Sequence, residues 1–221
     1  YFQKAMRRAN IDIAYSQGFS PHQIMSFAAP LSVGLTSDGE YFDIEVNSVP
    51  EVPNHEPEYA GLTASQIMLK QINSAMADGI TVTEICMLPE KCKNAMASVA
   101  AAGYTVRFRE GYEPDFEYRE SFSKFCAQDV IPYTKITQKT ETALNLKEYL
   151  FDYRVNEDGS IYLLVDASSS GNLKPVTILT TYYEQLGKEL SEFALLVHRE
   201  DTYLRKEDGT LGTLTSAGSD F

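Results

Sequence analysis

Cysteine is scarce in this sequence, at three residues in 221, and histidine is equally scarce. An odd and sparse cysteine count argues against a scaffold held together by disulfides. No apolar run approaches the roughly 18 residues that a membrane helix needs, so we expect no membrane segment. No complete GxSxG, P-loop or GxGxxG motif is present. The sequence therefore indicates no reaction, and we expect a protein without a catalytic site of its own.

Basic residues are also few. The chain has 19 Lys and Arg against 31 Asp and Glu, a net charge of −12. Broad binding to nucleic acid depends on neutralising phosphates, so we expect no DNA partner. The 43% hydrophobic and 23% charged content is typical of a soluble globular protein. Unpaired cysteines favour the cytoplasm.

Apolar spacing predicts the first half of the fold. Phe2, Ala5, Met6 and Ala9 form one helical stripe from the first residues, so we infer that upstream residues, including a first strand, are missing. Alternation in 25–33 and 42–46 predicts a hairpin across a turn at 36–39. Thr63 to Gln66 fits a capping box that begins a helix. Further patterns predict a loop at 48–61 and a strand at 80–85.

The second half shows a similar order of patterns. Asn156 to Gly159 is a strong turn signal, which predicts a hairpin between 147–155 and 160–166. An alanine-rich stretch at 89–102 that starts with proline predicts a connecting helix. The other expected elements are strands at 104–109, 130–138 and 193–197 and helices at 115–128 and 172–186.

The order of these elements predicts an α+β fold with two ferredoxin-like halves, each with an antiparallel sheet and helices on one side. The expected parts are an N-terminal half over 1–88, the connecting helix over 89–102, a C-terminal half over 103–204 and a flexible tail over 205–221. One continuous sheet shared by both halves is the alternative.

The stretch from Tyr15 to His22 concentrates polar and aromatic groups on one loop, with a turn set by Gly18 and Pro21. A loop of this kind could hold a planar ligand, and we expect it to line a pocket with His22 partly exposed. An ordered connector, with serine and glutamine capping backbone groups, is the other interpretation. The candidate binding residues are Tyr15, Ser16, Gln17, Gly18, Phe19 and His22.

A second polar stretch, from Ser168 to Pro175, follows a strand expected to be buried. Gly171 allows a close backbone approach, and Asn172 is expected to be the N-cap of the next helix. The positive end of the helix dipole and Lys174 would favour an anion. The alternative is a loop whose serines bond to their own backbone. The candidate anion-binding residues are Ser169, Ser170, Gly171, Asn172 and Lys174.

The run from Tyr1 to Glu45, with the stretch Ala14 to His22 at its centre, resembles the bacterial radical-SAM-linked domain family. Further matching segments are 94–97, 168–175, 192–194 and 198–200. The resemblance implies a domain with no assigned activity that is fused to a radical SAM protein or encoded beside one. The family usually begins with a strand and a Ser/Gly-His-Leu-Asp stretch, which this sequence lacks.

A radical SAM enzyme holds its cluster with three cysteines, usually as Cys-x3-Cys-x2-Cys. Here Cys86, Cys92 and Cys126 are separated by six and 34 residues, which does not bring thiolates together locally. His22, His55 and His198 are also scattered, so we expect no metal site. The resemblance then implies that the iron–sulfur cluster and S-adenosylmethionine belong to a partner enzyme.

The expected function is therefore that of an accessory or substrate-binding protein without catalytic activity, which works with a separate radical SAM protein. The alternative is an RNA-binding or RNA-modifying domain, by analogy with other paired ferredoxin-like folds. A basic cleft formed by Arg7, Arg8, Arg107, Arg109 and Lys135 would favour that alternative.

Overall fold

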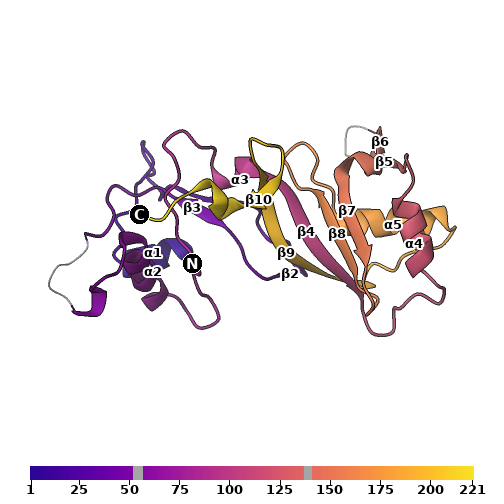
Figure 1. The fold of residues 1–221 in the computed structure, drawn as a ribbon, viewed down its shortest axis with the longest axis horizontal. Coiled ribbons are helices and arrows are strands. Elements are labelled where there is room, and N and C mark those ends of the chain that lie inside the picture. The colour runs from indigo at the N-terminus through magenta and orange to yellow at the C-terminus, as the bar shows by residue number, and fades with distance from the viewer. Residues whose placement is uncertain (52–56, 137–140) are drawn as a thin grey trace. The chain divides into compact units, whose positions relative to one another are not determined.

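The computed structural model describes residues 1–51, 57–136 and 141–221, so parts of the expected loop at 48–61 and strand at 130–138 lie outside the described residues. The chain divides into two compact units, an α+β fold in which the strands of the two units form separate sheets (Figure 1). Unit 1 comprises 1–28, 41–96 and 213–221. Unit 2 comprises 29–40 and 97–212.

Unit 1 packs two helices and a short hairpin around one apolar cluster. Helix α1 (Phe2–Arg8) buries Ala5 and Met6 as its stripe predicts, and α2 (Ala64–Ser74) contributes Met68 and Ile72. Strands β1 (Met25–Phe27) and β3 (Phe42–Ile44) pair antiparallel. A 3-10 turn, η1 (Pro57–Tyr59), precedes α2. The predicted capping box at Thr63 and Gln66 is confirmed, with both reciprocal bonds present.

Two predictions for unit 1 are wrong. Residues 80–85 form no strand. The backbone of Val82 is bonded by a side chain and not by a neighbouring strand: the Asn73 side-chain amide accepts from the Val82 N–H at 2.8 Å and donates to the Val82 carbonyl at 2.9 Å. The helix expected over 89–102 is reduced to α3 (Ala95–Ser98). Strand β4 (Val99–Phe108) begins directly after it, although alanine favours helices.

Unit 2 is built on a six-stranded sheet (Figure 1). The order β9–β4–β8–β7 is antiparallel throughout, with β7 (Leu150–Val155), β8 (Ile161–Asp166) and β9 (Leu195–Arg205). The predicted hairpin at Asn156–Gly159 joins β7 and β8, as expected. A separate pair, β5 (Pro132–Ile136) and β6 (Glu141–Asn145), precedes the 3-10 turn η2 (Leu146–Tyr149).

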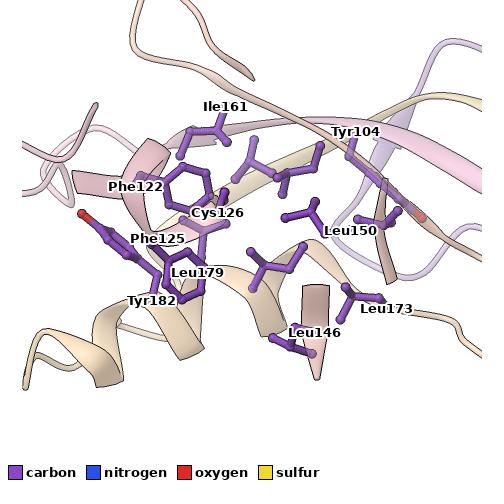
Figure 2. Close-up of a cluster of buried hydrophobic side chains, with 14 of the residues drawn as sticks. Tyr104, Phe122, Phe125, Cys126, Leu146, Leu150, Ile161, Leu173, Leu179 and Tyr182 are labelled. Carbon is purple, nitrogen blue, oxygen red and sulfur yellow. The ribbon is translucent and has the colours of Figure 1, made fainter. Parts of the chain in front are cut away.

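The core of unit 2 lies between the sheet and two helices, α4 (Arg119–Cys126) and α5 (Pro175–Gln185). Figure 2 shows Phe122 and Phe125 of α4 grouped with Tyr182 of α5. The Phe122 and Tyr182 rings meet edge to face with centroids 5.1 Å apart, an arrangement that aromatic pairs favour. Ile161, Leu163 and Val165 supply the facing side of β8.

Two segments depart from the expected layout. Residues 29–40 do not form the expected end of a strand and a tight turn. They belong to unit 2, where β2 (Thr36–Ser37) pairs parallel with β9, so the sheet of unit 2 is mixed and not purely antiparallel. The expected tail after 205 contains β10 (Leu211–Thr213), which joins the sheet edge, and the 3-10 turn η3 (Leu214–Ala217). Its last residues belong to unit 1, where Ser219 and Met87 exchange backbone hydrogen bonds.

Candidate functional site

The loop from Tyr15 to His22 is an exposed turn of unit 1. The Ser16 N–H donates to the His22 carbonyl at 2.8 Å, and Ser16 Oγ lies 2.8 Å from His22 Nδ1 in a side-chain hydrogen bond. The same hydroxyl oxygen accepts from the His22 N–H at 3.1 Å. Gly18 has φ of +113°, a conformation that favours glycine at the tip. These bonds close the loop across its base.

The apolar side chains of this loop face solvent. Phe19 has an exposed fraction of 112%, and Tyr15 is also exposed. Gln17 and His22 are exposed too. Neither of the two hollows described below is lined by this loop. The arrangement presents an aromatic ring outward, which suits contact with a partner surface better than enclosure of a small ligand.

A buried amide connects the loop to the helix behind it. Gln23 is 4% exposed, and its Nε2 donates to the Gln3 carbonyl at 3.2 Å and to Tyr15 Oη at 3.4 Å. Gln3 lies on α1. The loop is therefore anchored at its base to the unit 1 core and free to present its tip.

The stretch after β8 is stabilised by an internal carboxylate. Asp166 Oδ1 accepts from the Ser168 N–H at 2.8 Å and from the Ser168 hydroxyl at 2.6 Å, and Ser168 Oγ accepts from the Gly171 N–H at 3.2 Å. The Ser168 amide, the Ser168 hydroxyl and the Gly171 amide are thus bonded within the loop, next to the Asp166 carboxylate. Ser169 and Ser170 follow Ser168 on the same turn, where Ser170 Oγ is 3.1 Å from Ser168 Oγ.

The expected N-cap is wrong. Lys174 is the N-cap of α5 and makes no side-chain capping bond, and Pro175 occupies the first turn. Asn172 instead lies two residues before this N-cap and has φ of +47°, a left-handed conformation. Asparagine tolerates this left-handed conformation better than most residues do. The bonds among Asp166, Ser168 and Gly171 agree with the alternative interpretation of a loop that bonds to its own backbone, and anion binding stays a prediction.

Each unit has a hollow in its described residues. The unit 1 hollow, of about 130 Å³, lies beside Asp12, Ser48 and Met68. Hydrogen bonds from Asn47 and Ser48 lower the pKa of Asp12. The unit 2 hollow, of about 340 Å³, lies between the loop before α4 and the loop after α5, beside Phe116 and Lys188. Sequence reasoning missed the unit 2 hollow, although Glu113 and Asp115 lie between the aromatic residues Tyr112 and Phe116 and Gly187 indicates a helix end before Lys188.

The cysteines do not form a cluster site. Cys126 is completely buried in the unit 2 core, and burial raises the pKa of its thiol to about 12, so the thiolate that iron requires is disfavoured. Burial followed by the charges of Glu84 and Asp43 also raises the pKa of Cys86. In the described residues no group of three His, Cys, Asp or Glu side chains is placed to hold a metal ion. His55 lies outside the described residues.

Four of the five cationic side chains proposed for RNA contact, those of the arginines, make bonds within the protein. Arg8 donates to the Ala75 carbonyl, Arg109 donates to the Phe193 carbonyl, and Arg107 forms a 2.7 Å ion pair with Asp158. Each guanidinium thus has a partner already. Among helices of the described residues, none combines the length and apolar character that a membrane crossing requires.

Comparison with known proteins gives one match. No curated protein and no solved structure matches the chain. A family model described as an uncharacterized protein conserved in bacteria matches residues 1–175, which include the Tyr15–His22 loop and most of the unit 2 sheet. Because this match spans well over half of the 221 residues, the chain belongs to that bacterial family, DUF2344.

Proposed function

We propose that this protein is an accessory or substrate-binding protein that docks onto a radical SAM enzyme through the Tyr15–His22 loop. The observation that carries the proposal is the Phe19 ring, which stands fully in solvent on a loop closed by the Ser16–His22 bond. The same loop contains the most specific residues of the resemblance to the radical-SAM-linked family.

Exposure of a large aromatic side chain supports docking. A phenylalanine in water forgoes the burial that stabilises proteins, and aromatic anchors of this kind concentrate binding energy at interfaces. A loop held in one conformation loses little further entropy on binding. The Ser16–His22 bond and the Gln23 anchor together give the loop that preorganisation.

The proposal places the chemistry in the partner. The iron–sulfur cluster and S-adenosylmethionine belong to the radical SAM enzyme, because the buried Cys126 thiol is unsuited to a cluster. Three free cysteines favour a reducing compartment, so we place both proteins in the cytoplasm.

We also propose that unit 2 is a ferredoxin-like domain. Its strand order β9–β4–β8–β7, with one helix after β4 and one after β8, matches the split βαβ arrangement if β5 and β6 are an insertion. Unit 1 offers less support for a second such half, because its sheet has two strands.

The docking proposal predicts that Phe19→Ala weakens binding to the radical SAM protein encoded beside this chain. Loss of a central aromatic anchor costs about 2 kcal/mol or more, so we expect at least a roughly thirtyfold loss of affinity. Isothermal titration of the two purified proteins measures it. His22→Ala should also weaken binding, through the loop shape, while leaving the melting temperature nearly unchanged.

The matched control is Phe193→Ala, which removes another largely exposed phenylalanine, in unit 2. It should leave the affinity unchanged. Absence of binding between the wild-type proteins at micromolar concentrations would reject the proposed partner, and equal effects of the two phenylalanine variants would reject the proposed surface.

A further inference from the structure

Three aromatic residues belong to the lining of the unit 2 hollow. The buried Tyr183 lies at its floor and the Phe116 ring beside it, with centroids 5.6 Å apart in an edge-to-face contact, and Tyr112 lines the rim. Its volume of about 340 Å³ is at the lower end of the range typical of small-molecule sites. The hollow is thus suited in size to a ligand of a few heavy atoms.

A cation of the protein itself lines this hollow. The Lys188 ammonium lies 4.8 Å from the centroid of the Phe116 ring, within the range of a cation–π interaction. Its Nζ is also 3.4 Å from the Asp115 carboxylate. An external ammonium group could use the same two partners, the Phe116 ring and the Asp115 carboxylate. The Lys188 side chain is 42% exposed, so it can swing into solvent without leaving a buried charge.

The end of α5 determines where this lysine lies. Gly187 has φ of +66°, its N–H donates to the Glu184 carbonyl, and the Lys188 N–H donates to the Tyr183 carbonyl. This is the Schellman pattern of helix termination. The carbonyl end of the helix dipole lies next to the hollow and favours positive charge there.

The charges of the lining also favour a cation. Three acidic residues line the hollow: Glu113, Asp115 and Glu189. Lys188 is the one basic residue of that lining. Glu113 is held toward the loop, where its carboxylate accepts from the Gly111 N–H at 2.8 Å. Burial, and then the neighbouring Tyr182 and Asp115, raise the pKa of Tyr183 to about 12, so its hydroxyl stays neutral at the floor. An anionic ligand would meet repulsion at this lining.

We infer that this hollow is a binding site for the alkylammonium group of a small organic molecule, with Lys188 as an internal competitor that leaves when the ligand enters. The ligand ammonium would lie over Phe116 and pair with Asp115. This inference rests on unit 2 alone and does not depend on the proposed docking loop or its partner.

Butylammonium chloride is a suitable probe, titrated into the full chain against sodium chloride of equal ionic strength. The amides of Gly111 and Leu190 report on the site by NMR, because Gly111 bonds to Glu113 and Leu190 lines the hollow. We expect saturable shifts at these amides. Lys188→Met removes the competitor and keeps an apolar stem, so affinity should rise by about tenfold.

Two further variants test the contacts. Asp115→Asn changes a largely exposed side chain and should weaken binding by about threefold without loss of stability. Phe116→Leu removes the ring and should weaken binding by about tenfold. Lys124→Met is the control: Lys124 forms an exposed 2.7 Å pair with Glu120 on α4, and its loss should leave the affinity unchanged.

Two results would overturn the inference. One is the absence of saturable shifts at Gly111 and Leu190 in both the wild type and Lys188→Met while the spectra remain those of a folded protein. The other is binding of the probe with an affinity that neither Asp115→Asn nor Lys188→Met changes.

Discussion

Replacing Arg199 with methionine is expected to lower the free energy of unfolding by about 2–3 kcal/mol, because it removes a buried guanidinium that hydrogen-bonds to the partly exposed Glu40 carboxylate. Arg199 is 4% exposed, and its guanidinium donates at 2.5 Å both to the Glu40 carboxylate and to the Ala29 carbonyl. Burial lowers the pKa of Arg199, but the hydrogen bond and charge of Glu40 outweigh burial and raise it overall.

The size of this effect follows from what the substitution leaves behind. Without the guanidinium, the Glu40 carboxylate and the Ala29 carbonyl both lose a charged donor, and a hydrogen bond to a charged group contributes about 1.5–3 kcal/mol. Both belong to segment 29–40, which is attached to the sheet through the short parallel pairing of β2 with β9. We therefore expect the segment to detach as stability falls.

Urea denaturation of purified variants measures the loss. Arg107→Met is the matched control, since Arg107 lies on β4 of the same sheet and its pair with Asp158 is about half exposed. Exposed pairs contribute about 0–1 kcal/mol, so the control should change little. A similar loss in both variants would contradict the view that the buried Arg199 guanidinium anchors segment 29–40.

The elements that could be predicted from sequence are those whose signals are local. The capping box at Thr63 and Gln66 needs two side chains three residues apart, and the hairpin at Asn156–Gly159 needs a turn between alternating strands; both form as expected. The stripe of α1 is also local, and it buries Ala5 and Met6. In each case the partner groups lie within a few residues.

The predictions that failed depend on partners distant in sequence. The alanine-rich start of β4 favours a helix by propensity, yet it forms the centre of the sheet between β8 and β9. Small residues are needed there: a Cβ on Gly103 would lie 3.2 Å from the Tyr162 hydroxyl. Pairing of Thr36–Ser37 with β9, about 160 residues later, is equally beyond local patterns.

The two candidate sites also differ in how far apart in sequence their contacting residues lie. The bonds that close the Tyr15–His22 loop join Ser16 to His22, six residues apart, so a structured loop could be expected while its full exposure could not. The unit 2 hollow joins loops about 70 residues apart in sequence, and only their shared packing on the α5 end brings Asp115 to Lys188.

Gly171→Ala is expected to lower the free energy of unfolding by about 2 kcal/mol, the typical cost of inserting a methyl group into filled space. A Cβ at this position would lie within 3.0 Å of all three carboxyl atoms of Asp166. That carboxylate cannot move freely, because it holds the Ser168 amide and hydroxyl. The substitution must therefore displace either the loop or those bonds.

Gly39→Ala provides the control, since a Cβ at Gly39 meets nothing within 4 Å and its backbone is not left-handed. It should be neutral or slightly stabilising. A double-mutant cycle tests the cause: once Asp166→Ala has removed the carboxylate, Gly171→Ala should cost little further stability. An undiminished cost in the Asp166→Ala background would show that the glycine is required for some reason other than the close approach of this carboxylate.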